Sequence, residues 1–359
     1  MVSPRIPSLR TFPAKSLGVA SMAVTAGLVL SACGGDDSTT ITGEGSTAQQ
    51  RAMTHFSDLL TDEGGAVLDY TGSGSGAGVK KFLSGDVDFA GTDSPLKPEE
   101  ATQAKERCGG NDAWHLPLVA GPVAIAYNLP GVENVTLNAE TLAEIFNGKI
   151  TTWNDDKIAA LNKGVKLPST PIVPVHRTDS SGTTDNFTTF LKANAPGQWP
   201  YEPSKEFPVQ GGSGAAKSTG VGDTVKKTEG ALTYVEWGFA TENDLGIAHM
   251  DFGAGSTELN AQSTGRALDA ASFVTPGSKD LIVDTDALYK LSEAGAYPLV
   301  LTTYEVVCST GYSDDAISGA LKEAFSTILD KGQDGLAELG YVPLPEQFAS
   351  ALRSTIDAL

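Results

Sequence analysis

The sequence predicts an α/β protein built from two parts. From residue 41 onward, short apolar runs typical of strands alternate with segments in which the apolar residues have helical spacing. At 359 residues the chain exceeds what one hydrophobic core usually holds. Two mid-chain apolar runs, 116–127 and 297–307, bracket a long block, which suits a chain that crosses into a second part and returns. We therefore expect mostly parallel sheets and two connecting strands that form a hinge.

The elements follow from the local pattern, in chain order. In the first half we expect a strand at 67–70, a helix ending near Ser84, a strand at 87–90, a helix after Ser94-Pro95, the apolar run 116–127, and helices at 139–147 and 155–162. In the second half we expect a strand at 172–176, a helix at 183–193, an irregular Gly-rich loop at 198–219, strands at 230–235 and 297–307, and a mainly helical tail from 314 to 359.

Three turns rich in Gly, Ser and Thr each directly precede a predicted helix: Gly45-Ser46-Thr47, Ser73-Gly74-Ser75-Gly76 and Ser180-Ser181-Gly182-Thr183. A helix start leaves backbone N–H groups unpaired and carries the positive end of the helix dipole, so it attracts anions. Glycine lets a ligand approach the backbone, and Ser or Thr adds a hydroxyl donor. One such turn is ordinarily only a helix cap. Three of them, with an Arg and an Asp nearby, indicate an oxyanion site.

The N-terminus has the pattern of a secretory signal. Three basic residues precede an apolar run at 17–30, which is followed by Leu30-Ser31-Ala32-Cys33. A Cys at this place resembles the lipobox of bacterial lipoproteins, which implies that residues 1–32 are a signal peptide and that Cys33 is lipidated. Residues 33–40 would then be a tether. The alternative is a membrane-spanning helix, but the run is shorter than the roughly 20 residues that a span needs.

Charge limits the partners. The formal net charge is −19. All charged residues in the predicted signal peptide are basic, so its removal makes the net charge more negative. This argues against nucleic acid and anionic membrane surfaces as partners, and it means that local donors must bind any anion. We expect the protein to be lipid-anchored on the extracytoplasmic face of the cell membrane. In that oxidising setting the two remaining cysteines, Cys108 and Cys308, are expected to form a disulfide, the alternative being two separate buried thiols.

Taken together, the chain resembles the phosphate-binding lipoproteins that serve as solute receptors of the high-affinity phosphate ABC transporter (Pst family). The resemblance covers nearly all of residues 40–350 and rests on the joint presence, in the family's order, of motifs at 43–47, 70–76, 87–93, 148–153, 177–183 and 230–236. It implies a two-lobe, type II binding-protein fold, with residues 41–120 and 303–359 in one lobe and 121–302 in the other. It also implies inorganic phosphate as ligand, a permease and ATPase complex as partner, and neither cofactor nor enzymatic activity.

The resemblance also implies the residues that hold the phosphate by hydrogen bonds alone. The first lobe would supply Thr47, Ala48, Ser75 and Asp93, and the second lobe Arg177, Ser181, Gly182 and Thr183. Asp179 would orient Arg177 rather than touch the ligand. One departure is Ala48-Gln49, where many relatives carry Phe-Pro. The backbone donor survives that change, whereas packing at the rim is expected to differ.

Asp93 gives the predicted site its selectivity. Orthophosphate keeps at least one proton at neutral pH, and an ionised carboxylate accepts that proton; sulfate offers none. The alternative role for Asp93 is a cap for the helix that follows Ser94-Pro95.

Other functions fit the sequence less well. A secreted phosphatase would need a nucleophile or a metal, but Ser75 lacks the G-x-S-x-G pattern and the four histidines lack paired metal spacing. The segment 212–218 is superficially like a P-loop, yet Ala216 rather than Gly precedes Lys217. A receptor for sulfate or molybdate, and a surface adhesion or scaffold protein on the same fold, remain as alternatives.

Overall fold

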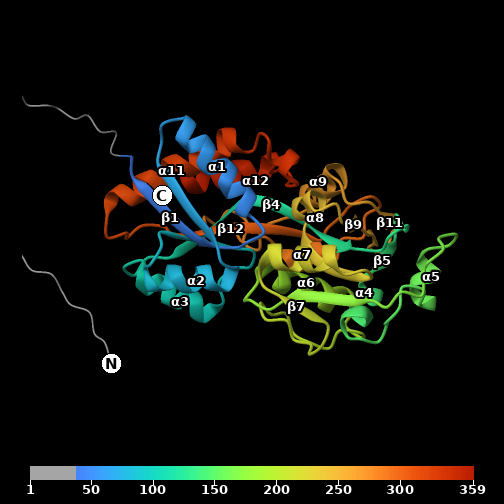
Figure 1. Ribbon diagram of the computed structural model, residues 1–359. Coiled ribbons are helices and arrows are strands. Elements are labelled where there is room, and N and C mark those ends of the chain that lie inside the picture. Colours follow the sequence, from blue (N-terminus) through green and yellow to red (C-terminus); the bar gives the residue numbers. More distant parts are fainter. Residues whose placement is uncertain (1–37) are drawn as a thin grey trace, which may run out of the picture. The chain divides into compact units, whose positions relative to one another are not determined.

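Two long strands, β4 (Ala113–Tyr127) and β12 (Val300–Cys308), run through the middle of the fold (Figure 1). They pair antiparallel, from Val300 opposite Pro122 to Cys308 opposite Ala113. All of β12 and nearly all of β4 are buried, which explains why both segments are mainly apolar instead of alternating, although β12 also carries the buried polar residues Thr302, Thr303 and Glu305. These strands are the two mid-chain runs of the sequence. The computed structural model describes residues 38–359, so the predicted signal peptide and Cys33 lie outside the described residues.

The strands form one mixed sheet with the order β2-β1-β3-β12-β4-β8-β6-β7, and β9 also pairs with β4. We call β2, β1, β3, β12 and the start of β4 the first half-sheet, and the end of β4 with β8, β6 and β7 the second half-sheet. Both flanks pair in parallel, whereas the central strands pair antiparallel. The remaining strands of this sheet are β1 (Thr40–Gly45), β2 (Val67–Gly72), β3 (Phe89–Thr92), β6 (Val173–Arg177), β7 (Ser213–Ala215), β8 (Ala231–Glu236) and β9 (Gly246–Ile247).

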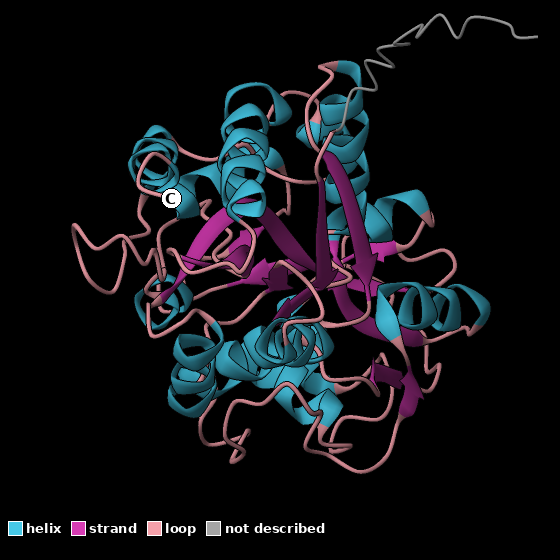
Figure 2. Cartoon of the chain, turned by 90° about the vertical axis from the view of Figure 1, so that its left-hand side faces the viewer, coloured by secondary structure: helices cyan, strands magenta, loops and turns pink. Residues whose placement is uncertain are grey.

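A small second sheet joins β5 (Thr136–Asn138), β10 (His249–Asp251) and β11 (Ser256–Thr257). Helices cover both sides of the strands (Figure 2). They are α1 (Gln50–Asp62), α2 (Ser75–Ser84), α3 (Pro98–Arg107), α4 (Ala139–Phe146), α5 (Asp156–Leu161), α6 (Gly182–Asn194), α7 (Lys217–Lys227), α8 (Trp237–Glu242), α9 (Ala261–Asp269), α10 (Thr285–Tyr289), α11 (Asp315–Thr327) and α12 (Glu346–Ile356). Short helical turns at Ile328–Gly332 and Leu336–Leu339 separate the last two.

Helical spacing of apolar residues explains how the helices pack. In α1, Met53, Phe56 and Leu60 are buried on one face. Helix α2 ends at Gly85, which has the left-handed conformation (φ 78°) that ends many helices. The segment 198–219, expected to be a loop, contains β7 and the start of α7. Glycines obscure α7 in the sequence, but a Cβ at Gly222 would lie 2.3 Å from the Phe239 ring, so close packing against α8 requires glycine there.

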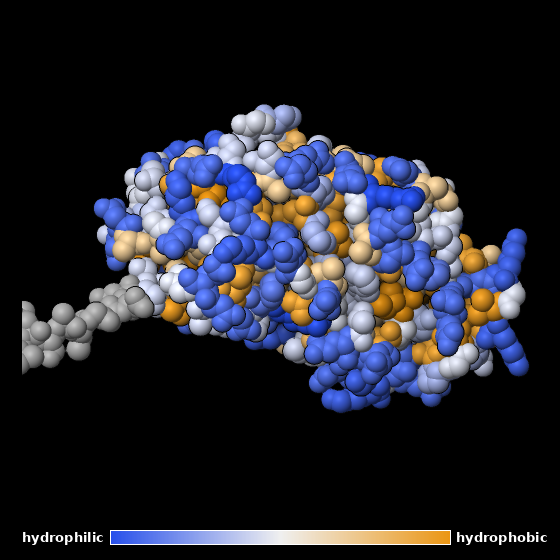
Figure 3. Space-filling model, turned by 90° about the horizontal axis from the view of Figure 1, so that it is seen from above, coloured by the Kyte–Doolittle hydropathy of each residue, from blue (hydrophilic) through white to orange (hydrophobic). Residues whose placement is uncertain are grey.

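Hydrophilic residues cover most of the face in Figure 3, with hydrophobic areas small and scattered. Among residues 38–359, no helix has the length and apolar character that crossing a membrane requires.

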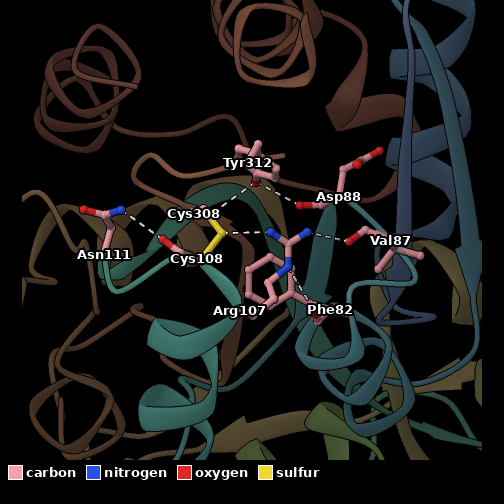
Figure 4. The surroundings of a disulfide bond; sticks show 8 residues. All are labelled: Phe82, Val87, Asp88, Arg107, Cys108, Asn111, Cys308 and Tyr312. Carbon is pink, nitrogen blue, oxygen red and sulfur yellow. Dashed lines mark hydrogen bonds between the residues drawn. A yellow bond between two sulfur atoms is a disulfide. The ribbon is translucent and has the colours of Figure 1, made fainter. Parts of the chain in front are cut away.

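The expected disulfide between Cys108 and Cys308 is present (Figure 4) and joins the end of α3 to the end of β12. The Arg107 guanidinium lies over the rings of Phe82 and Tyr312, at 4.5 and 5.0 Å from their centroids. It also donates a 2.9 Å hydrogen bond to Sγ of Cys308. The disulfide is therefore part of a packed cluster that fixes one end of the central strand β12.

Candidate anion-binding site

Asp93 lies directly after β3, at the meeting point of three other elements. Its Oδ1 accepts a 2.8 Å hydrogen bond from Oγ1 of Thr303 in β12. Its Oδ2 accepts longer bonds from the hydroxyls of Ser75 (3.3 Å), at the start of α2, and Thr183 (3.5 Å), at the start of α6. The residue is only 3% exposed. The carboxylate is therefore surrounded by hydroxyl donors from both half-sheets.

Burial raises the pKa of Asp93, while hydrogen bonds from Ser46 and Thr303 and the charge of Arg177 oppose that increase. The alternative role of Asp93 as a helix cap is wrong, because α3 begins at Pro98 and its N-cap residue is Lys97. The carboxylate does not cap α3; it accepts hydrogen bonds from the hydroxyls of Ser75, Thr183 and Thr303.

Arg177 is the last residue of β6 and is also 3% exposed. Its Nε donates to Oδ1 of Asp179 at 2.7 Å, and its Nη2 donates to Oδ2 of the same carboxylate. Asp179 also accepts the backbone N–H of Lys217 at 2.9 Å. Burial alone would raise the pKa of Asp179, but the hydrogen bonds and charge of Arg177 outweigh it and lower the pKa. The fork-to-carboxylate pairing fixes the plane of the guanidinium.

The start of α6 faces the first half-sheet. The hydroxyl of Ser181 accepts the N–H of Thr184 at 3.1 Å and so caps the helix. At Gly182 an added Cβ would lie 2.5 Å from Oγ of Ser75 and 2.7 Å from Cβ of Asp93. Glycine is therefore required at this position, because any side chain would separate the two half-sheets.

Two further hydrogen bonds cross between the half-sheets at this point. The N–H of Gly76 in α2 donates to the carbonyl of Ser180 at 3.1 Å. Nδ2 of Asn186 in α6 donates to the backbone carbonyl of Asp93 at 2.6 Å and to that of Gly182 at 2.9 Å. The predicted residues Ser75, Asp93, Gly182 and Thr183 thus form one cluster held by direct contacts.

The start of α1 contacts different partners. Oγ1 of Thr47 and Oγ of Ser218 are 2.9 Å apart, and the Ser218 N–H also donates to Thr47 at 3.3 Å. The N–H of Ala48 donates to Oγ of Ser46 at 3.1 Å. Thr47 and Ala48 therefore share a turn with Ser46, which hydrogen-bonds Asp93, but neither contacts the Asp93 carboxylate directly.

Comparison with known proteins gives consistent results. Residues 31–327 match the model of the PBP superfamily domain. The chain is 42% identical over 330 residues to phosphate-binding protein PstS 3 of Mycobacterium leprae, covering 91% of this chain and 88% of that protein. It is 41% identical to phosphate-binding protein PstS 3 of Mycobacterium tuberculosis, covering 92% and 95%.

The chain belongs to the PstS family of phosphate-binding proteins.

Solved structures show the fold of this PstS-family chain. A high-affinity periplasmic phosphate-binding protein, PfluDING, solved with phosphate bound, superimposes with a TM-score of 0.72 at 24% identity. The superposition covers 88% of this chain and 93% of that one. The fold is therefore the two-lobe, type II arrangement that the resemblance implied.

Several residues that contact this cluster have no signal in the sequence. Ser46 stands in a predicted turn, but Thr303, Asn186 and Ser218 come from a buried strand, a helix interior and a presumed loop. In the P-loop-like segment, the Lys217 side chain donates to the carbonyl of Gly72 at 2.8 Å, and residues Ser213–Ala215 form strand β7. Only Asn186, one helical turn after Gly182, could have been placed on the same side of α6 by spacing.

Three of the four histidines, His55, His115 and His176, have hydrogen-bond partners for their side chains. In the buried His115, Nε2 accepts the Leu96 N–H at 2.9 Å and Nδ1–H donates to Asp280 at 2.6 Å. Between residues 38 and 359, no group of three or more His, Cys, Asp or Glu side chains is placed to hold a metal ion.

A cavity of about 580 Å³ lies beside the α1 start and is lined by Thr47, Ser218, Arg51 and Glu236 among others. Glu236 is the N-cap of α8, and its Oε2 accepts the N–H of Phe239 at 3.2 Å. Burial raises its pKa to about 8, although the charge of Arg51 opposes the increase. Glu236 is thus a buried carboxyl whose pKa lies well above the usual range of glutamate.

Proposed function

We propose that this protein binds inorganic phosphate between two lobes outside the cytoplasm and delivers it to an ABC permease for import. Family membership supports the ligand and the transport role. The observation that carries the proposal within the chain is the buried Asp93 carboxylate, which is placed among hydroxyl donors from both half-sheets. An anion site that contains a carboxylate suits a ligand that brings its own proton.

The proposed ligand contacts are Thr47, Ala48, Ser75 and Asp93 on one side and Arg177, Ser181, Gly182 and Thr183 on the other. A phosphate taken out of water is strongly destabilised unless its oxygens find donors. Helix starts, hydroxyls and a guanidinium provide those donors without a metal. Asp179 is proposed as a supporting residue, since it pairs with Arg177 through two hydrogen bonds.

We propose residues 41–120 and 303–359 as the first lobe and residues 121–302 as the second. The pairing of β4 supports this division: residues up to Pro122 pair with β12, and residues from Val123 onward pair with β8. The second lobe also reaches back to the first near its end, because Phe273 packs against Phe348 and Lys279 accepts a hydrogen bond from Thr355. The strands β4 and β12 would form the hinge.

The finer placement is also a proposal. Cys33, after a signal peptide of residues 1–32, would carry the lipid that holds the protein on the outer face of the cell membrane, with residues 33–40 as tether. The partner would be the permease and ATPase complex of a phosphate transporter. Mass spectrometry of the membrane fraction would test the anchor: a diacylglyceryl group on an N-terminal Cys33 supports it, and an unmodified chain that begins elsewhere contradicts it.

Ligand-dependent melting tests the proposed function. A ligand that binds only the folded state raises the melting temperature as its concentration exceeds the dissociation constant. Phosphate should raise the melting temperature of the purified protein at micromolar to millimolar concentration, and sulfate or molybdate at equal concentration should not. A shift with sulfate or molybdate alone would identify another oxyanion receptor. No shift with any oxyanion would favour a scaffold protein.

A further inference from the structure

A second buried carboxyl group, Glu305, lies behind the proposed phosphate site. Glu305 belongs to the central strand β12, two residues after Thr303, the residue that donates to Asp93. In the ladder it stands opposite Gly91 of β3 and Leu116 of β4, and it is fully buried. The pairing with β4 shifts register between Thr303 and Tyr304, and Glu305 lies close enough to Asp93 for the charge of Asp93 to raise its pKa.

The side chain of Gln49 is the hydrogen-bonding partner of Glu305. Gln49 is the N-cap residue of α1 and is also fully buried. Its Nε2 donates to the hydroxyl of Tyr70 at 3.0 Å and to Oε2 of Glu305 at 3.3 Å. The Tyr70 hydroxyl in turn donates to the carbonyl of Ser46 at 2.9 Å. Because the Tyr70 hydrogen is used in that bond, the Gln49 atom facing Tyr70 must be the donor nitrogen, which fixes the orientation of the amide.

With the amide in this orientation, two acceptor oxygens have no hydrogen-bond donor. Within the described part of the chain, Oε1 of Gln49 and Oε1 of Glu305 are buried and have no hydrogen-bond partner. They belong to two groups that already share one N–H···O bond. A carboxylic acid and a primary amide can form two parallel hydrogen bonds, but only when the acid carries its proton. A proton on Oε1 of Glu305 that is donated to Oε1 of Gln49 would give both unpartnered oxygens a partner.

The charges around Glu305 favour the same conclusion. The ionisable groups that face it are Asp93, from the loop after β3, and Tyr70, from β2, and neither is a cation. Burial and the charge of Asp93 raise the pKa of Glu305 well above its usual range, while the bond from Gln49 opposes this. An ionised Glu305 would be an uncompensated buried charge beside Asp93.

We propose that Glu305 is held as a neutral carboxylic acid whose Oε1–H donates to Oε1 of Gln49, and that this pair positions the start of α1 for phosphate. The inference rests on the proposed function, because the α1 start carries Thr47 and Ala48. The turn is tied on both sides, to Glu305 through Gln49 and to Tyr70 through Ser46. Glu305 is thus a positioning residue, and its neutrality keeps a further negative charge away from Asp93 and the bound anion.

Infrared spectroscopy tests the protonation state directly. The spectrum of the wild-type protein minus that of Glu305→Gln, at pH 7, should contain the carbonyl band of a protonated carboxylic acid. The matched control is Glu236→Gln, which removes a different buried carboxyl and should remove a separate band. If the Glu305→Gln difference shows only the bands of a carboxylate, the proposal is overturned. This result does not depend on whether phosphate binds, so it separates this inference from the proposed function.

Calorimetry with inorganic phosphate tests the positioning role. Glu305→Gln keeps a neutral group that both accepts from and donates to Gln49, so its dissociation constant should stay within about threefold of wild type. Glu305→Leu loses the pair and should bind roughly fivefold to tenfold more weakly. Equal weakening by Gln and Leu would overturn the role.

Discussion

Nδ2 of Asn186 donates a 2.6 Å hydrogen bond to the backbone carbonyl of Asp93. Asn186 belongs to α6, which follows β6 of the second half-sheet, whereas Asp93 follows β3 of the first half-sheet. The same amide nitrogen bonds the carbonyl of Gly182, and the amide oxygen accepts the hydroxyl of Tyr289. With every polar atom of the Asn186 amide engaged, its side chain is fixed in one orientation. The backbone of Asp93 is therefore held from the second half-sheet while its carboxylate is held by Thr303.

Replacing Asp93 should change selectivity as well as affinity. Asp93→Ala removes the only carboxylate in the proposed contact set, so phosphate loses an acceptor for its proton and sulfate loses a repelling group. One charge-assisted hydrogen bond is worth about 1.5–3 kcal/mol. We expect weaker phosphate binding and a smaller ratio of phosphate to sulfate affinity, measured by calorimetry. The control is Asp86→Ala, an exposed aspartate paired with Lys81. Unchanged affinity and ratio would assign the selectivity to another group.

The same selectivity should depend on pH. Because burial raises the pKa of Asp93, the carboxyl becomes protonated at a higher pH than an exposed aspartate does. A protonated Asp93 can donate to sulfate and no longer repels it. The ratio of phosphate to sulfate affinity should therefore fall as the pH is lowered, beginning above the usual titration range of aspartate. A ratio that stays constant down to pH 4 would contradict this.

Removing the guanidinium should weaken phosphate binding strongly. Arg177→Ala takes a buried, charge-assisted donor from the site and leaves Asp179 without its partner. We expect a loss of several kcal/mol in binding free energy. Arg177→Lys should recover only part of it, because an ammonium group cannot bond two oxygens as a planar fork does. Arg266→Ala, far from the site in α9, serves as the control. If Arg177→Ala binds phosphate with wild-type affinity, Arg177 does not contact the phosphate.

A methyl group at Gly182 should hinder closure of the lobes. The added Cβ would lie 2.5 Å from Oγ of Ser75 and 2.7 Å from Cβ of Asp93. Both distances are shorter than non-bonded atoms allow, so these groups would have to move apart. The free energy needed to separate the lobes would reduce the binding free energy of phosphate. Gly182→Ala should therefore weaken phosphate binding by about tenfold or more. Gly265→Ala in α9, where a Cβ meets nothing within 4 Å, should bind as wild type does. Equal affinity of the two variants would show that the contact is not needed.

Glu236 should make stability depend on pH. Its folded-state pKa of about 8 lies above the 4.5 of an exposed glutamate, so between these values the folded protein holds a proton that the unfolded chain releases. Stability from this group is therefore full below pH 4.5 and is lost as the pH rises toward 8. Melting temperatures of Glu236→Gln and wild type should diverge in favour of the variant as the pH rises from 5 to 9. Parallel curves would contradict the raised pKa.

Much of the fold could be predicted because local patterns agreed with tertiary structure. The two mainly apolar runs form the central strands because both are covered on two faces, and the Gly/Ser turns do begin helices. Helix α7 was missed because its glycines serve packing against Phe239, a tertiary requirement that lowers local helix propensity. Local pattern alone predicted α/β alternation but not the antiparallel pairing of β4 and β12, which depends on the path of the returning chain.

The residues of the site could be predicted where one turn carries several hydrogen-bond donors. They could not be predicted where a distant strand or helix contributes a single side chain. Ser75, Gly182 and Thr183 stand in recognisable turns, and these meet at Asp93. Thr303 and Glu305 stand in a buried strand that also contains the polar residue Thr302, and the local pattern does not tell which of these side chains reaches the site. Their roles depend on which loop the strand passes, and that is known only from the assembled sheet.

Calorimetric titration of the purified wild-type protein with phosphate and then with sulfate tests the central claim most directly. The account predicts saturable binding of one phosphate per chain, with sulfate at least about a hundredfold weaker, because the buried Asp93 accepts the phosphate proton and repels a bare sulfate oxygen. Equal binding of the two anions, or no heat with phosphate under conditions in which the protein is folded, would contradict it.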